Sequence, residues 1–124
     1  MNNLMNVLIV EDESAIRNLI STALETNGYN FEMATNGSMA LSLLVKHQFD
    51  IILLDLGLPD LDGIDIIKKL RTFSFTPIIV ISARSNDDDK ITALDIGADD
   101  YITKPFSVEA VSYTHLTLPT NREV

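Results

Sequence analysis

The sequence predicts an α/β protein, built as a doubly wound parallel sheet with helices on both faces. Short apolar runs of strand length recur about every 20 to 25 residues along the chain, and helical patterns of apolar residues lie between them. Alternation of this kind is typical of a parallel sheet covered by its crossover helices. Ligands of such sheets bind beyond the carboxyl ends of the strands, where the strand order reverses.

Five stretches are expected to form the strands. The runs at 7–10, 51–54 and 78–81 contain only Val, Ile and Leu, as strands buried on both faces do. Residues 29–34 alternate apolar and polar side chains, which indicates a half-buried or edge strand. Residues 100–103 are expected to form a short fifth strand.

Helices are expected in the intervals between these strands. A helix that includes Ile16 to Leu24 can end at Gly28, and further apolar stripes with helical spacing follow. They consist of Ala40, Leu41, Leu44 and Val45, of Ile64, Ile67 and Leu70 after Gly63, and of Ile91, Leu94 and Ala98 around Gly97. A fifth helix could begin near Ser107.

Length, charge and composition narrow the function. The 124 residues fit one domain, and a hydrophobic content of 46% is enough for a core. The net charge of −9 argues against binding of nucleic acid or an anionic membrane by this chain. Without cysteine it has no disulfide and no thiolate metal site. The sequence shows no signal peptide or membrane span, so a cytoplasmic protein is expected.

Polar side chains follow four of the five predicted strands. Glu11 and Asp12 come after the first strand, Asp55 after the third, Ser82 after the fourth and Lys104 after the fifth. Because the carboxyl ends of parallel strands meet at one edge of the sheet, these side chains are expected to converge there. A carboxylate such as Asp55 is costly to bury without a partner.

The chemistry of such a cluster follows from its charges. Carboxylates packed together raise one another's pKa, and a hard cation such as Mg²⁺ relieves their repulsion with oxygen ligands. Lys104 could pair with Asp55 or with an incoming phosphoryl oxygen, and Ser82 offers a hydroxyl donor. Asp55 is therefore a candidate nucleophile that forms an aspartyl-phosphate.

Each of these residues also has an ordinary structural interpretation. Glu11 and Asp12 could be acids at a helix N-terminus, where the helix dipole favours them. Lys104 could be a solvated lysine, and Ser82 could cap a following helix. The functional interpretation depends on all five residues standing at successive strand ends, rather than on any one of them.

Five motifs resemble the receiver domain of bacterial two-component response regulators: "VLIVEDE", "LLDLGLPDLDG", "ISARS", "ALDIGADDY" and "TKPF". The resemblance covers residues 4 to about 110 and implies a flavodoxin-like (CheY-like) sheet of five strands in the order 2-1-3-4-5. It implies that Asp55 accepts a phosphoryl group from a sensor histidine kinase. It also implies Mg²⁺ bound by Asp12, Asp55 and the Gly57 carbonyl, with Glu11 reaching the ion through water.

The same resemblance assigns a switch to the site. Ser82 would turn its hydroxyl towards the phosphoryl group, and Tyr101 would be the aromatic residue that turns inward with it. Lys104 would hold the phosphoryl oxygens, and the Lys104–Pro105 bond would be cis, which a tight turn after a strand allows.

A narrower resemblance points to the winged-helix (OmpR/PhoB-like) class of regulators. The stretches "DDKITALDIGADDYITKPF" and "SARS" carry it, and "DLGLPDLDG" is particularly similar to KdpE-type regulators. In this class the receiver dimerises through the fourth helix, fifth strand and fifth helix. Lys90, Asp99, Asp100 and Glu109 match charged residues of that face.

The chain departs from this class at its end. A receiver domain is expected over 1–110, without a DNA-binding domain after it. Residues 111–124 read "VSYTHLTLPTNREV", rich in strand formers and interrupted by Pro119, so they do not continue an amphipathic helix. They are similar to a translated cloning adapter, although a divergent short helix is the alternative. With the fifth helix truncated or altered, a weak homodimer at most is expected.

Three other functions compete with a phosphoacceptor signalling module. In an aspartate-nucleophile phosphatase a second Asp stands two residues after the nucleophile, where this chain has Gly57. In a flavodoxin-like electron carrier the flavin phosphate would meet Glu11 and Asp12 instead of an anion cradle. A receiver that is not phosphorylated and only docks a partner is the third alternative.

Overall fold

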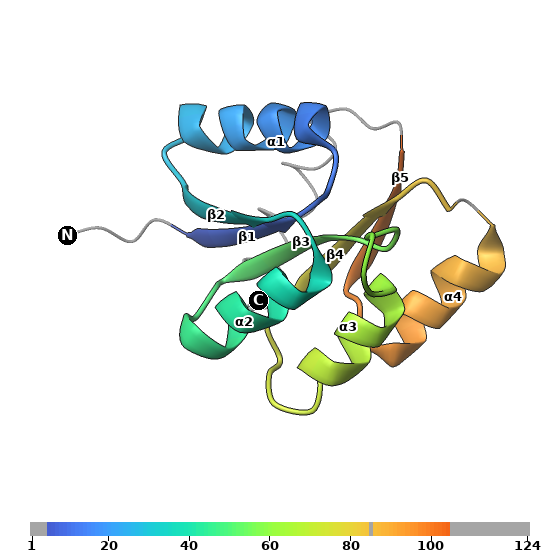
Figure 1. Ribbon diagram of the computed structural model, residues 1–124. Coiled ribbons are helices and arrows are strands. Elements are labelled where there is room, and N and C mark those ends of the chain that lie inside the picture. Colours follow the sequence, from blue (N-terminus) through green and yellow to red (C-terminus); the bar gives the residue numbers. More distant parts are fainter. Residues whose placement is uncertain (1–4, 85, 105–124) are drawn as a thin grey trace, which may run out of the picture.

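The fold is one parallel sheet with helices on both sides (Figure 1). The computed structural model describes residues 5–84 and 86–104. The strands are β1 (Asn6–Val10), β2 (Asn30–Ala34), β3 (Ile51–Asp55), β4 (Ile78–Ser82) and β5 (Asp100–Thr103). The helices are α1 (Ser14–Thr26), α2 (Gly37–Lys46), α3 (Gly63–Leu70) and α4 (Asp87–Ile96).

The order of the five strands is β2-β1-β3-β4-β5, and every neighbouring pair is parallel, which confirms the predicted doubly wound α/β sheet. The run 29–34 corresponds to β2, which is an edge strand as its alternating pattern predicted. The chain enters the sheet at β1, adds β2 on one side and then crosses to β3 on the other. The strand order therefore reverses between β1 and β3, where a ligand site is expected.

The central strands separate two apolar layers. α1 covers one face of the sheet, and α2, α3 and α4 cover the other (Figure 1). Successive residues of a strand point to opposite faces, so Val7 and Ile9 pack towards α1 while Leu8 and Val10 pack towards the other three helices. This double burial explains why β1, β3 and β4 are apolar without alternation.

The helices expose part of their predicted apolar stripes. Val45 is 75% exposed at the end of α2, and Ile91 is 56% exposed on α4, where Ala93 is the buried residue. On α2 and α4 the face that contacts the sheet is thus narrower than the apolar pattern, whereas the stripe of α3 packs against the core. The stripes thus predicted the helices correctly but overstated which side chains lie in the core.

Several predictions fall outside the described residues. These are the fifth helix near Ser107, the Lys104–Pro105 bond, the role of Glu109 and the atypical stretch 111–124. Within the described part of the chain, no helix is long and apolar enough to cross a membrane.

Candidate functional site

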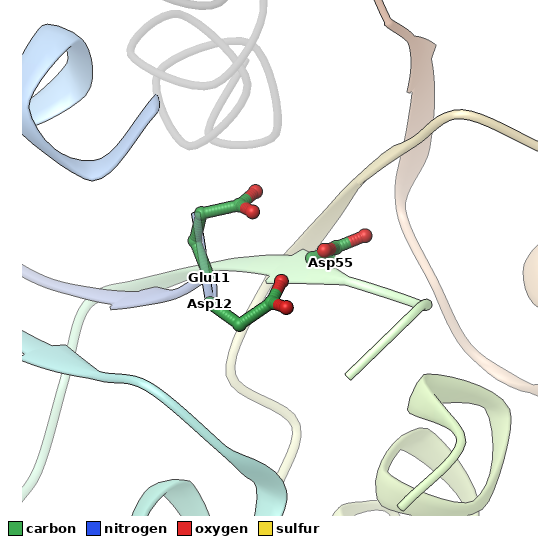
Figure 2. A group of neighbouring side chains, drawn as sticks. All are labelled: Glu11, Asp12 and Asp55. Atoms are coloured by element: carbon green, nitrogen blue, oxygen red, sulfur yellow. The ribbon is translucent and has the colours of Figure 1, made fainter. Parts of the chain in front are cut away.

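Three carboxylates meet at the carboxyl edge of the sheet. Glu11 and Asp12 follow β1, and Asp55 ends the neighbouring strand β3. One carboxylate oxygen from each lies within 4.8 Å of the others, and Figure 2 shows the three side chains gathered there. Glu11 is only 2% exposed and Asp55 only 5%, whereas Asp12 faces solvent.

Lys104 extends from the end of β5 into this cluster. Its Nζ lies 3.1 Å from Oε1 of Glu11, 3.1 Å from Oε1 of Glu13 and 3.4 Å from Oδ2 of Asp55. Burial alone would lower the pKa of Lys104, but the hydrogen bond to Glu13 and the charges of Asp55 and Glu11 raise it above 10.5. The lysine is therefore held as a cation beside the carboxylate of Asp55.

The pKa of Glu11 is higher than that of an ordinary exposed glutamate. Burial and the charge of Asp55 raise its pKa from 4.5 to about 7, although the Glu13 N–H and the Lys104 ammonium partly offset them. The Glu13 N–H donates to Oε2 of Glu11 at 3.1 Å. In the metal-free protein, the Glu11 carboxyl thus titrates near neutral pH.

A cleft of about 390 Å³ opens over the cluster. Besides Asp12, Asp55 and Lys104, its walls include Gly57 and Ser82. Ser82 is buried and its Oγ accepts a hydrogen bond from the Arg84 N–H at 3.0 Å. The Gly57 N–H donates to Oδ1 of Asp55 at 3.1 Å, which fixes one oxygen of that carboxylate.

Arg84 connects two sides of the cleft mouth. Its guanidinium lies 3.2 Å from Oδ2 of Asp62, at the start of α3. Its backbone carbonyl accepts a hydrogen bond of 2.6 Å from the hydroxyl of Tyr101, a residue of β5. Tyr101 is buried, so in this structure its ring already points into the molecule.

The loop after Asp55 is held by contacts within itself and with the start of α2. An antiparallel bridge joins Gly57 to Asp62, and the Asp62 carboxylate caps α3. Asp60 accepts from the N–H groups of Gly37 and Ser38 at 2.7 and 2.9 Å, which lowers its pKa. The nucleophile candidate is therefore followed by a loop whose position depends on α2 and α3.

The predicted interface residues have different surroundings. Lys90 is exposed on α4. Asp99 is partly buried, where Arg71 lies 3.3 Å from Oδ2 and the Ile78 N–H donates to the same oxygen at 2.8 Å. Oδ1 of Asp100 accepts from the N–H of Tyr101 at 2.7 Å. Their role in a dimer remains a prediction.

Sequence reasoning missed three acids around the site. Asp62 stands directly before Gly63, and an Asp before a helical stripe is a recognisable N-cap signal. Asp60 binds residues 22 and 23 positions earlier, a contact that no local pattern indicates. Glu13 is the third member of the run "EDE", and its importance depends on the position of Lys104 in space.

The site has the donors that a hard cation prefers. Glu11, Asp12 and Asp55 offer only oxygen atoms, and Lys104 alone does not neutralise their combined charge. Two of the three carboxylates are buried, where unbalanced charge is costly. This acidic pocket therefore fits Mg²⁺, which takes oxygen ligands and keeps several waters.

Two solved structures with the same architecture are a receiver domain and a chemotaxis response regulator. The receiver domain of the Francisella response regulator 1452 has a TM-score of 0.89 at 36% identity, and the match covers 95% of this chain and 98% of that one. The chemotaxis response regulator CheY4 of Vibrio cholerae has a TM-score of 0.86 at 32% identity, covering 92% and 98% of the two chains.

Two curated relatives are a transcriptional regulatory protein and a response regulator. The KDP operon transcriptional regulatory protein KdpE of Escherichia coli is 53% identical over 103 residues, which are 83% of this chain and 46% of that protein. The response regulator ArlR of Staphylococcus haemolyticus is 41% identical over 104 residues, 84% of this chain and 48% of that protein.

The chain thus spans a little under half the length of these two relatives. The match to KdpE supports the narrower resemblance to KdpE-type regulators. The family described as the response regulator receiver domain matches residues 7–113, nearly the whole chain. The chain therefore belongs to the response regulator receiver domain family.

Proposed function

We propose that the chain is a phosphoacceptor module whose Asp55 receives a phosphoryl group from a sensor histidine kinase. The observation that supports this most directly is the position of the Asp55 carboxylate. It lies at the cleft, 3.4 Å from a lysine ammonium and within 4.8 Å of two further carboxylates. An anionic nucleophile beside these groups suits phosphoryl transfer, where positioning and charge neutralisation supply most of the catalysis.

The transfer requires little covalent chemistry from the protein. An Asp55 oxygen attacks the phosphorus of a phosphohistidine, an O–P bond forms, and the P–N bond breaks. The imidazole of the kinase leaves with the bond electrons and takes up a proton. Lys104 offsets the negative charge on the phosphoryl oxygens, while the Gly57 N–H holds the second Asp55 oxygen.

Mg²⁺ is the cofactor that this proposal needs. When bound, the ion would neutralise the negative charge on the phosphoryl oxygens and on the attacking carboxylate. Asp12, Asp55 and the Gly57 carbonyl would be its protein ligands, and Glu11 would bind through water. The excess of carboxylates in the pocket supports this assignment.

Phosphorylation would act as a switch rather than begin a turnover cycle. In this proposal the Ser82 hydroxyl leaves the Arg84 N–H and turns to the phosphoryl group. The β4–α4 loop then moves, and Tyr101 responds because its hydroxyl is bound to the Arg84 carbonyl in that loop. A charge added at one point would in this way bias the packing of α4 and β5.

The family supports a proposal for the partners. The proposed donor is a sensor histidine kinase in the cytoplasm, and the proposed output in longer relatives is DNA binding by the rest of the protein. A weak homodimer through α4 and β5, with Lys90, Asp99, Asp100 and Glu109, remains a proposal. So does the absence of any enzymatic activity beyond the protein's own phosphorylation and dephosphorylation.

Intact-mass spectrometry after treatment with acetyl phosphate tests the proposal. The wild-type chain is expected to gain one phosphoryl group in the presence of Mg²⁺ and none when the metal is chelated. Asp55→Asn should remove the gain, because an amide is not a nucleophile for phosphorus. Asp65→Asn is the matched control, since Asp65 is an exposed acid on α3 away from the cleft.

Two results would contradict the proposal. Phosphorylation of Asp55→Asn would place the acceptor elsewhere. Absence of any adduct in a wild-type chain with a cooperative thermal transition would favour a receiver that only docks its partner. A chain without such a transition would instead show that the domain is not folded under those conditions, and the measurement would be repeated under conditions where it is.

A further inference from the structure

A second groove lies at the amino ends of the strands, opposite the carboxyl ends where the acidic cleft is found. It has a volume of about 490 Å³ and runs between residues 44–49, at the end of α2, and residues 70–76, at the end of α3. Phe49 precedes β3 and Thr76 precedes β4, so the groove is at the amino ends of these strands. Figure 1 shows α2 and α3 on the same face of the sheet, with the loop after α3 projecting beyond it. We call this feature the basal groove.

Two large apolar side chains that line the basal groove are exposed, and a third, Phe75, lies beside it in the loop after α3. Val45 is 75% exposed, Phe73 52% and Phe75 92%. Phe49 and Leu70, by contrast, are buried beneath them. Single exposed apolar residues are common on protein surfaces, but Val45 and Phe73 line the same groove and Phe75 stands in the adjoining loop. Aromatic residues such as these dominate the energetics of interfaces.

The rim of the groove is basic although the chain has a net charge of −9. Lys46 and His47 line it, and Lys69 lies in the last turn of α3, four residues before Phe73. Within the described residues, neither Lys46 nor Lys69 forms an ion pair, in contrast to Lys104 in the acidic cleft.

Two local features could weaken this contrast. Asp50 lies four residues after Lys46, where one of its oxygens accepts a hydrogen bond from the Asn6 N–H at 2.7 Å. Asp65 lies four residues before Lys69 on α3, and within the described residues the two form no ion pair. Lysines in the last turns of α2 and α3 also stabilise the helix dipoles. The dipoles explain the lysines, but they do not explain the exposed phenylalanines beside them.

We propose that the basal groove docks an acidic amphipathic helix of a partner protein. A helix that lays an apolar face into a groove is a recurring mode of recognition, and Phe73, Phe75 and Val45 would contact that face. Its flanking Asp and Glu residues would pair with Lys46 and Lys69. Because the basal groove and the phosphoacceptor cleft are at opposite edges of the sheet, a partner could remain bound while Asp55 is phosphorylated.

Synthetic peptides test the proposal directly. The probe is a fluorescein-labelled amphipathic helix of about 18 residues, with Leu and Phe on one face and Glu on the rest. Fluorescence anisotropy should show binding that weakens with salt, and a peptide with Lys in place of Glu should bind at least about tenfold more weakly. Amide shifts in ¹⁵N-labelled protein should be confined to residues 44–49 and 69–76.

Substitutions in and beside the groove separate the apolar from the charged contributions to peptide binding. Combined Phe73→Ser and Phe75→Ser changes should weaken binding about tenfold or more, and circular dichroism should show an intact fold because both side chains are exposed. Lys69→Glu should weaken binding of the acidic peptide. Lys68→Glu is the matched control, because this exposed lysine of α3 lies two residues before Leu70 and therefore on the opposite side of the helix from the groove.

Three outcomes would overturn the proposal. Equal affinity for the Glu and Lys peptides would show that charge does not select the partner. No binding at millimolar peptide would show that the groove does not bind an amphipathic helix. Concentration-dependent shifts of residues 44–49 and 69–76 without peptide would assign the groove to a second copy of the chain. Phosphorylation of Asp55 is measured by mass spectrometry without the peptide. The proposed docking and the proposed phosphoryl transfer can therefore be contradicted independently.

Discussion

The carboxyl of Glu11 is placed where its charge is disfavoured. It is 2% exposed and close to Asp55, and its pKa rises from 4.5 to about 7. The folded metal-free protein therefore keeps a proton on Glu11 up to about pH 7, whereas the unfolded chain loses that proton near pH 4.5. The stability that this group contributes is complete below pH 4.5 and is lost as the pH rises to about 7.

The substitution Glu11→Gln tests this linkage. Urea denaturation in EDTA should show that the wild type loses stability relative to Glu11→Gln between pH 4.5 and 7.5, because glutamine has no proton to release. Comparing the difference between the two proteins cancels groups that titrate in both. A difference that does not change with pH would contradict the raised pKa. Glu32→Gln, at an edge-strand residue outside the cleft, is the control.

At the scale of elements, the loop between β3 and α3 depends on a close contact at Gly63. A Cβ added there would lie 2.6 Å from the Cα of Leu56 and 3.0 Å from the carbonyl oxygen of Asp55. Both are backbone atoms, so a flexible side chain cannot move aside to relieve the contact. At Gly57, in the same loop, a Cβ would meet only an Asp55 oxygen, at 3.9 Å.

This difference predicts unequal effects for two alanine substitutions. Gly63→Ala should destabilise the domain by about 1–3 kcal/mol through overpacking and should slow phosphorylation, because the loop after Asp55 must shift. Gly57→Ala should leave the thermal midpoint nearly unchanged. Thermal unfolding and the rate of phosphorylation by acetyl phosphate measure both effects. Equal destabilisation by the two changes would contradict the structural explanation.

Arg71 joins the ends of α3 and α4. Its guanidinium donates to the carbonyls of Gly97, Ser74 and Thr76, and it pairs with Asp99. Gly97 ends α4 with a φ of 131°, where the chain turns towards β5. The guanidinium binds the chain at this turn, because it donates to the Gly97 carbonyl. The end of α4 is therefore anchored to the loop before β4.

Removal of this guanidinium should be costly. Arg71→Ala is expected to lower the free energy of unfolding by about 2–4 kcal/mol, because partly buried carbonyls and the Asp99 carboxylate lose a donor. Lys68→Ala, an exposed cation on the same helix, should change it by less than about 0.5 kcal/mol. Urea unfolding of both variants compares them, and similar values for the two would argue against the anchor.

The elements show what could be predicted from sequence. The strands were predictable because two-sided burial requires uninterrupted apolar runs, and Asp55 stood out as a carboxylate at the end of one. Arg71 and Asp60 were not, because their partners are distant in the chain. The exposed Val45 was also unexpected, since an apolar stripe indicates a helix but does not define which of its residues the sheet covers.

The whole molecule separates its charges and its exposed apolar surface. Carboxylates collect at one edge of the sheet, around a single lysine, and the lysines and phenylalanines of the basal groove lie at the other. The central strands β1, β3 and β4 between them are buried on both faces. Phosphorylation and docking could therefore occupy one domain without competing for surface.

The net charge of −9 and the acidic pocket should make stability depend on Mg²⁺ in two separable ways. Any salt screens general repulsion, but a metal that binds only the folded state adds about 2.7 kcal/mol at a hundred times its Kd. In a domain of this size that raises the thermal midpoint by several degrees more than NaCl of equal ionic strength. Asp12→Asn should remove this additional rise and retain the response to NaCl. An equal rise with both salts in the wild type would mean that the pocket binds no Mg²⁺ and would leave the proposed phosphoryl transfer without its cofactor.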